Sequence, residues 1–167
     1  MAMTEIDAIV VTLGPGSYTG LRVGLATAKG IAYTLEKPLI GLSTLSALAA
    51  AAIQLSPTSI EASTQIFSMI DARRMEVFGA IYDASLKPIL SEQAMVLDQT
   101  KWSSLISQPT ICIGNGHLKT KDFTSTHHLI YLDGNYTSQV LLDLAMAKWT
   151  AGQFEDLAYV GPNYLKE

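Results

Sequence analysis

The chain has 167 residues, of which 49 % are hydrophobic and 16 % are charged, and this composition excludes an intrinsically disordered protein. Its formal net charge of −4 argues against a strongly basic surface for nucleic acid, because phosphate contacts need clustered lysine and arginine. No apolar run reaches the length of about 18 residues that spans a bilayer. The first residues also lack the basic region of a signal peptide, so we expect no membrane segment.

The first half of the chain predicts alternating strands and helices. Residues 6–13 (IDAIVVTL) are nearly all apolar, as in a strand that is covered on both faces. After the turn GPGSYTG, apolar residues recur from Leu21 at steps of four and three, which places them on one face of a helix that ends before Pro38. A short buried strand (38–43) and a second helix (44–55) follow.

The second half predicts a further layer of strands and helices. Residues 57–65 are rich in serine and threonine and are the best candidate boundary, so we expect one lobe over residues 1–62 and a second over residues 63–167. Beyond the boundary we expect strands at 66–73, 76–83, 89–97 and 109–114 and helices at 99–107 and 137–152. The alternation favours an α/β fold.

The turn between the first strand and the first helix is rich in glycine, as many phosphate-binding turns are. Its spacing fits neither a dinucleotide fingerprint, nor a Walker A loop, nor the nucleophile elbow of a hydrolase. Backbone amides at the start of a helix can nevertheless hold an anion. The candidate contacts are Gly14, Gly16, Ser17, Thr19 and Gly20.

Small residues continue in the helix behind this turn. Gly24 and Ala28 are four residues apart, as are Ala26 and Gly30, although a glycine within a helix costs about 1 kcal/mol relative to alanine. From spacing alone, two interpretations remain open: the helix packs closely on the sheet of its own chain, or it contacts a helix of a second subunit. Tyr18 in the turn is the strongest candidate for an exposed aromatic residue that binds a partner.

The reactive side chains do not form a recognisable catalytic group. His117, His127 and His128 lack the i, i+4 spacing of a helical metal pair, so we expect no metal site, and we expect no cofactor. Asp71 and Glu76 form either a carboxylate pair or, with the two arginines between them, an ion network on the surface. The short basic cluster of Lys119 and Lys121, with His117 nearby, predicts a solvated loop.

A lone cysteine, Cys112, lies in an apolar run and cannot form a disulfide within the chain. We expect its thiol to be an inert part of the core, and the absence of a C-x-x-C motif fits a protein of the reducing cytoplasm. The aromatic residues Tyr33, Tyr82, Trp102 and Trp149 either fill the core or anchor a partner.

Three segments resemble the TsaB (YeaZ) family. They are the long block TLGPGSYTGLRVGLATAKGIAYTLEKPLIGLSTLSALA (12–49), the block IDARRMEVFGAIYD (70–83) and the closing PNYLKE (162–167), which has lysine where the family has arginine. The resemblance implies an actin-like, ASKHA-type fold of two ribonuclease-H-like lobes. It also implies that the first lobe lacks its leading strands and first helix. The strand at residues 6–13 would then have a bare edge, which invites pairing with another chain.

The resemblance also implies a function. Family members support formation of N6-threonylcarbamoyladenosine at position 37 of tRNA as inactive paralogues of the TsaD enzyme. We therefore expect a scaffold that is not an enzyme by itself, binds a TsaD-like enzyme and a TsaE-like ATPase, meets tRNA only indirectly and forms a homodimer in isolation. Family pairing through helices of the first lobe favours the second interpretation above. The expected partner contacts are Tyr18, Leu21, Arg22, Gly24, Leu25, Ala28 and Ala32.

The nucleotide site of the superfamily looks damaged in this sequence. The phosphate hairpin of its second lobe reads Asp-x-Gly-Gly-Gly-Thr, whereas bulky residues replace the glycines here at residues 71–76. Asp71, Gly114, Asn115 and Gly116 are the candidates for a relic of that site. Two other functions remain as alternatives: a glycoprotease-like hydrolase and a small nucleotide-binding protein.

Overall fold

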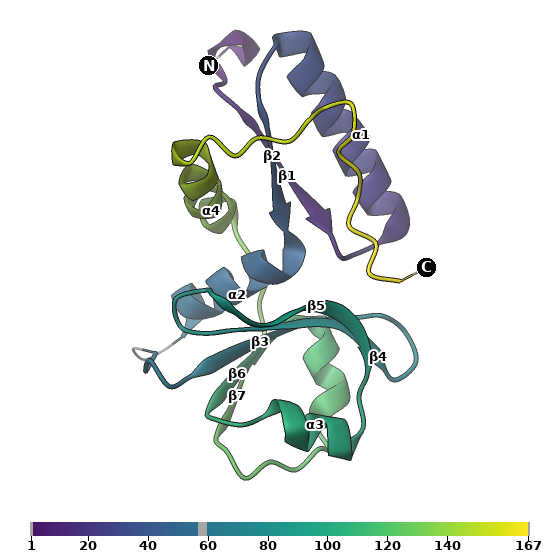
Figure 1. Ribbon diagram of the computed structural model, residues 1–167, viewed down its shortest axis with the longest axis vertical. Helices are drawn as coiled ribbons and strands as arrows, with labels where there is room; N and C mark the ends of the chain where they lie inside the picture. Colours follow the sequence, from purple (N-terminus) through teal and green to yellow (C-terminus); the bar gives the residue numbers. More distant parts are fainter. Residues whose placement is uncertain (1, 57–59, 167) are drawn as a thin grey trace. The chain divides into compact units, whose positions relative to one another are not determined.

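The computed structural model in Figure 1 describes residues 2–56 and 60–166. Contacts divide the chain into a first unit, Met1–Ala47 with Thr137–Tyr164, and a second unit, Leu48–Tyr136 with Leu165–Glu167. This grouping differs from the expected lobes, because residues 137–164 pack with the N-terminal part of the chain and the division falls before residue 62. Part of the connector predicted at residues 57–65 lies outside the described residues.

The first unit is a small sheet with a helix on each face. After a short 3-10 helix, η1 (Met3–Glu5), strand β1 (Ile9–Gly14) pairs in parallel with β2 (Leu39–Ser43). Helix α1 (Tyr18–Leu35) covers one face, and α4 (Ser138–Thr150) covers the other (Figure 1). The parallel pair and its crossover helix confirm the predicted alternation of strand and helix.

Helix α1 begins and ends where its local sequence directs. Ser17 caps the first turn, and its hydroxyl accepts a hydrogen bond from the Gly20 amide at 3.4 Å. At the other end Glu36 adopts a left-handed conformation, and the Lys37 amide donates to the Ala32 carbonyl at 2.9 Å. Pro38 then prevents further helix and leads into β2.

The segment after α4, residues 153–164, returns along the first unit as an extended strap (Figure 1, yellow). The Glu155 amide donates to the Leu39 carbonyl at 2.8 Å, and the Asn163 amide donates to the Leu13 carbonyl at 2.7 Å. Leu157 and Val160 add apolar contacts to the core beneath α1. The strap therefore belongs to the fold of this unit.

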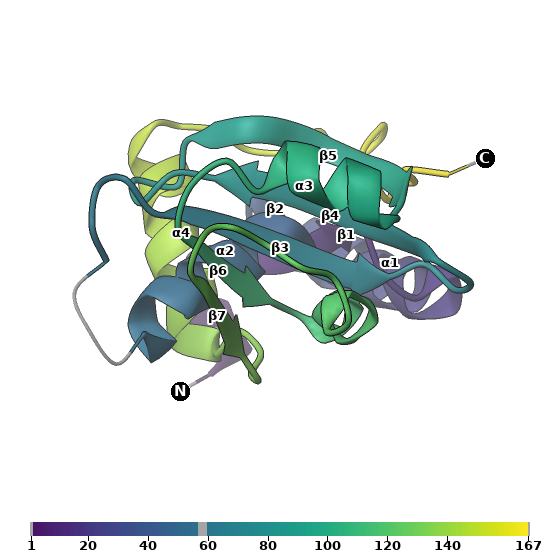
Figure 2. The ribbon, with the colours of Figure 1, turned by 90° about the horizontal axis from the view of Figure 1, so that it is seen from below.

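The second unit has a five-stranded sheet in the order β5-β4-β3-β6-β7, whose strands lie side by side in Figure 2. Strands β3, β4 and β5 are antiparallel neighbours, whereas β6 and β7 run parallel to β3. The strands are β3 (Gln65–Asp71), β4 (Glu76–Tyr82), β5 (Pro88–Val96), β6 (Thr110–Ile113) and β7 (Leu129–Leu132). Sequence analysis did not predict β7, because only four half-buried residues form it.

Three helices complete the second unit. Helix α2 (Thr44–Leu55) enters the unit at Leu48, α3 (Gln99–Leu105) follows β5, and the 3-10 helix η2 (Asn115–Thr120) follows β6. Trp102 of α3 is fully buried against Phe67 of β3, with ring centroids 6.0 Å apart. None of the described helices is both long and apolar enough to cross a membrane.

Candidate functional site

Part of the predicted partner surface of α1 faces the core of its own unit. Leu25, Ala28 and Ala32 are buried in one core cluster with Leu39, and Ile9, Val11 and Leu13 pack against the same cluster. These three helix residues were expected to contact a partner, and that expectation is wrong for them. They recur at the spacing that places side chains on one helical face, and β1 and β2 of the same unit cover that face.

The opposite side of α1 is exposed and built from small residues. A Cβ atom added at Gly24 or Gly30 would meet no atom within 4 Å, so packing among the described residues does not require glycine at either position. Val23, next to Gly24, is 61 % exposed. We name this side the open α1 face and define it by Gly20, Val23, Gly24, Thr27, Gly30 and Thr34.

The hydroxyl groups on this face are satisfied within the helix. Thr27 donates to the Val23 carbonyl at 2.9 Å, and Thr34 donates to the Gly30 carbonyl at 2.8 Å. With its polar atoms paired internally, the open α1 face is a smooth surface that another helix can approach closely. The distance between two packed helices depends on the side chains at their contact, so small residues allow a close approach.

The first glycine of the glycine-rich turn, Gly14, is required because the strap passes close to it. Gly14 has φ +119°, and a Cβ atom there would lie 2.9 Å from the Asn163 carbonyl oxygen. Leu21, another predicted partner contact, is half-buried and packs against Gly14 and Gly16. At the helix start, the Gly20 and Leu21 amides donate to Ser17. These two amides are therefore not free to bind an anion. Anion binding by the turn stays a prediction.

An aromatic cluster lies at the start of α1. The Arg22 Nε donates to the Tyr164 hydroxyl at 2.9 Å, and its guanidinium lies 4.2 Å from the centre of the Tyr18 ring. The two tyrosine rings stack at 5.1 Å. The hydrogen bond to Tyr164 is the main reason why the pKa of Arg22 is raised. Tyr18 and Arg22 remain exposed, so both are available to a partner.

The four residues of the expected relic nucleotide site do lie together. The Asn115 side-chain oxygen accepts from the Asp71 amide at 2.9 Å. Gly114 has φ +89°, and an added Cβ atom would lie 2.3 Å from the Met69 carbonyl oxygen; at Gly116 it would lie 2.8 Å from the Met69 Cβ. Both glycines therefore serve the close packing of η2 on β3.

Two lysine side chains form ion pairs with Asp71 and Glu76. Lys119 Nζ lies 2.5 Å from the Asp71 carboxylate and 2.7 Å from the Glu76 carbonyl oxygen, and Lys166 pairs with the Glu76 carboxylate. Hydrogen bonds from Lys119 and from the Arg73 amide lower the pKa of Asp71, and the bond from Lys166 lowers the pKa of Glu76. The predicted ion network is present: lysines from distant segments form its direct ion pairs, and the charges of Arg73 and Arg74 also act on Asp71 and Glu76.

The predictions for His117 and Cys112 have different outcomes. His117 is only 3 % exposed, so the expectation of a solvated loop is wrong for it; its Nε2 lies 3.3 Å from Asp133 and its ring packs on Tyr131. Cys112 is buried, and burial raises the pKa of its thiol to about 12, which makes it unreactive. Among the described residues, no three metal-binding side chains gather into one group.

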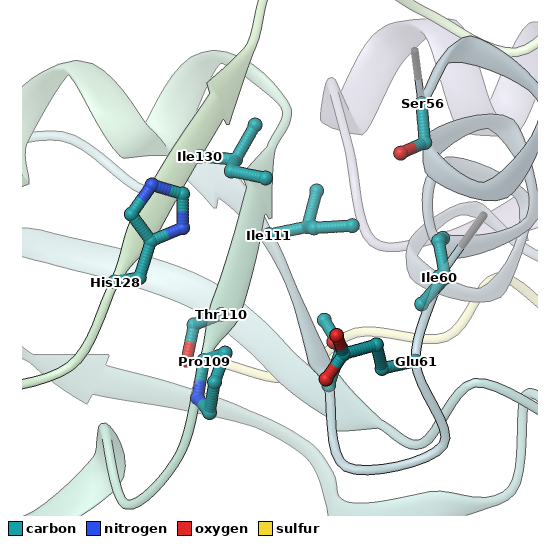
Figure 3. A pocket seen from close by; sticks show the side chains of 9 residues that line it. Ser56, Ile60, Glu61, Pro109, Thr110, Ile111, His128 and Ile130 are labelled. Carbon is teal, nitrogen blue, oxygen red and sulfur yellow. The ribbon is translucent and has the colours of Figure 1, made fainter. Parts of the chain in front are cut away.

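A cavity of about 280 Å³ opens beside β6 and β7 in the second unit (Figure 3). Glu61 and His128 supply its ionisable groups, and Ile111 and Ile130 lie between them in the view. No hydrogen bond joins this carboxylate and imidazole among the described contacts, so the cavity presents no assembled acid–base pair. Sequence analysis missed it because its walls come from segments that are far apart in the chain.

Comparison with known proteins gives concordant results. A family model described as "TsaD: tRNA N6-adenosine threonylcarbamoyltransferase" matches residues 1–137. A TsaB protein of Escherichia coli K12 is 28 % identical over 99 % of this chain and 73 % of its own length. TsaB of Bacillus subtilis is 31 % identical over 69 % of this chain, which is 49 % of that protein. A YeaZ-like structure from Pseudomonas aeruginosa, 24 % identical, superposes with a TM-score of 0.77 over 99 % of this chain and 76 % of that one.

Proposed function

Since the chain belongs to the TsaD family of tRNA N6-adenosine threonylcarbamoyltransferases, we propose that it supports formation of N6-threonylcarbamoyladenosine in tRNA. In this proposal the chain is a scaffold without catalysis of its own, and it binds a TsaD-type enzyme that performs the reaction. The relatives named TsaB, tRNA threonylcarbamoyladenosine biosynthesis proteins, support this role. The fold, shared with YeaZ-like structures, is consistent with it.

The observation that carries the scaffold role is the open α1 face. Glycine at positions 24 and 30 lowers the stability of α1, and no described packing contact compensates for this cost. Such a cost fits a surface that packs on a second polypeptide. We propose that this face forms a homodimer in the isolated protein and that Tyr18 and Arg22 extend it. Three of the other predicted contacts, Leu25, Ala28 and Ala32, pack between the helix and the sheet.

The polar groups around the expected relic site already have partners within the chain. This supports a scaffold over a hydrolase or a nucleotide-binding protein. Lys119 pairs with the Asp71 carboxylate, and η2 packs against β3 where a relic nucleotide site was expected. The Cys112 thiol is buried. A hydrolase needs a nucleophile with a base or a metal-bound water, and these residues do not supply such an arrangement.

The net charge of −4 supports a division of labour in which the partner holds the tRNA. We further propose that a TsaE-type ATPase joins the assembly and that the protein works in the cytoplasm. Calorimetry with ATP and ADP separates this proposal from a nucleotide-binding protein. Heat of saturable binding to this chain alone would favour that alternative.

The test compares leucine substitutions at exposed positions of two helices. Gly24→Leu fills the open α1 face, whereas Ala147→Leu adds a leucine at an exposed position of α4, outside that face. We expect Gly24→Leu to reduce co-purification with the TsaD-type enzyme, or self-association in sedimentation, by about tenfold, and Ala147→Leu to leave both unchanged.

Function is tested in a strain that lacks the corresponding gene. The wild-type gene product should restore the modified nucleoside in tRNA, as measured by mass spectrometry of digested tRNA. Failure of the wild type to bind the enzyme and to restore the nucleoside would contradict the proposal. Equal loss in both leucine variants would show that the open α1 face has no special part in assembly.

A further inference from the structure

Arg22, in the first turns of α1, is held in a defined orientation although its side chain is exposed. Its Nε donates to the Tyr164 hydroxyl at 2.9 Å. Its guanidinium lies 4.2 Å from the centre of the Tyr18 ring and 5.9 Å from that of the Tyr164 ring, and the two rings stack at 5.1 Å. We name these three residues, all of the first unit, the Arg22 cluster.

The guanidinium of Arg22 uses only part of its hydrogen-bonding capacity. Most N–H donors of an arginine belong to its terminal amino groups, and the bond to Tyr164 uses only Nε. In the part of the chain that the structure describes, no carboxylate forms an ion pair with Arg22. The terminal amino groups are therefore available to a carboxylate, which a guanidinium binds through two parallel hydrogen bonds.

The charges of α1 indicate what kind of surface supplies this carboxylate. Arg22 and Lys29 are the charged residues of the helix, and residues 8–35 contain no aspartate or glutamate. Lys29 donates to the Val160 carbonyl at 3.2 Å. Two copies of α1 packed on each other would thus bring together like charges, whereas an acidic segment of another protein is complementary to this helix.

The Arg22 cluster lies on the side of α1 along which the strap runs. Arg22 and Lys29 are seven residues apart, so they lie on the same side of the helix, and each contacts the strap. Gly24 lies on another side, because residues two apart in a helix point in nearly opposite directions. Substitutions can therefore test the Arg22 cluster and the open α1 face separately.

A carboxylate of a protein fits the cluster better than a phosphate of RNA. Phosphate binding depends on several clustered basic residues, and the charged residues of α1 are Arg22 and Lys29 in a chain of net charge −4. The rings of Tyr18 and Tyr164 already stack on each other, so they are not open platforms for bases.

We propose that the Arg22 cluster binds an acidic side chain of the partner enzyme, an inference that rests on the scaffold function proposed above. Arg22 donates to this carboxylate through its terminal amino groups. Tyr164 is a positioning residue, since its hydroxyl holds Arg22 by Nε. Because α1 of a second copy supplies no acid, the Arg22 cluster favours the enzyme over self-association.

The test measures binding of the full chain to the TsaD-type enzyme by calorimetry. Arg22→Gln should weaken binding about tenfold and reduce its dependence on salt, because charged hydrogen bonds are lost. Self-association in sedimentation should weaken at most about twofold, since two copies bring no carboxylate to Arg22. The control Lys101→Gln removes an exposed positive charge from α3 and should leave enzyme binding unchanged.

A double-mutant cycle tests the part of Tyr164. Tyr164→Phe keeps the ring beside Tyr18 but removes the hydroxyl that accepts from Arg22, so it should weaken enzyme binding about threefold. In the Arg22→Gln background the same change should have no further effect. Equal losses in the two backgrounds would show that Tyr164 acts on the fold and does not position Arg22.

Enzyme binding that is the same in the wild type and Arg22→Gln would overturn the inference. Equal loss of enzyme binding and self-association would assign the Arg22 cluster to a second copy, and saturable tRNA binding that Arg22→Gln abolishes would assign it to phosphate. If the wild type fails to bind the enzyme, the scaffold proposal fails as well. If Gly24→Leu weakens binding and Arg22→Gln does not, only the inference about the Arg22 cluster fails.

Discussion

At the scale of single residues, glycine illustrates how one amino acid serves opposite purposes in this chain. Gly114 is required by a positive φ and by the Met69 carbonyl, which leaves no space for a side chain. Gly24 has ordinary helical geometry and open space around it. The first serves the fold from within, and the described packing does not explain the second.

This contrast gives a prediction for stability. Gly114→Ala should lower the free energy of unfolding by about 2–4 kcal/mol, since both strain and a steric clash act against it. The control is Gly152→Ala, because Gly152 has φ +66° but no neighbour within 4 Å. Strain alone should cost about 1 kcal/mol there. Urea denaturation measures both, and equal losses would contradict the clash with Met69.

Asp71 gives a prediction for pH. Its pKa is lowered in the folded chain, chiefly by the hydrogen bond from Lys119, so the ion pair stabilises the fold above the ordinary aspartate pKa. This contribution is lost as the pH falls through the lowered value. Because the carboxylate is partly exposed, we expect only about 0.5 kcal/mol.

Lys119→Met should move the pKa of Asp71 back up toward its ordinary value. Titration of the carboxyl carbon by NMR measures this directly. The matched control is Lys121→Met, since Lys121 is exposed and does not contribute to the shift. A titration that is the same in all three proteins would show that Lys119 does not hold this carboxylate.

At the scale of elements, α1 has two faces with opposite tolerance to leucine. Ala28→Leu inserts three carbon atoms into a filled core beneath the helix and should cost about 1–3 kcal/mol of stability. Gly24→Leu should instead raise the stability of the helix by about 1 kcal/mol, because it replaces an exposed glycine.

Thermal unfolding of both variants measures these opposite effects. Sedimentation of the same samples then separates folding from assembly. A stabilised Gly24→Leu protein that associates about tenfold more weakly is the expected result. If Gly24→Leu instead lowered the unfolding temperature as much as Ala28→Leu does, the open α1 face would have to be part of the core.

At the scale of the whole molecule, the C-terminal strap joins segments from the two ends of the chain in the first unit. Ending the chain after Gly152 removes Leu157 and Val160 from the core and uncovers the Leu39 carbonyl. We expect the unfolding temperature to fall by several degrees. A chain that ends after Tyr164 keeps these contacts and serves as the control. If both chains melt like the wild type, the strap does not stabilise the unit.

The sequence by itself determined the local structure and the family. Helix α2 and the extents of most other elements follow from apolar spacing, caps and prolines, because these act between residues close together in the chain. Four half-buried residues left β7 unrecognised, since so short a strand has too little periodicity to detect.

Only the tertiary structure decided which side of each element is free. It placed Ala28 inside and Gly24 outside, paired Asp71 with Lys119 instead of its neighbouring arginine side chains, and grouped residues 137–164 with the N-terminal strands. Apolar spacing identifies the apolar face of α1, but not whether the sheet of its own chain or a second subunit will cover that face. That choice depends on contacts between distant segments, and those contacts exist only once the chain has folded.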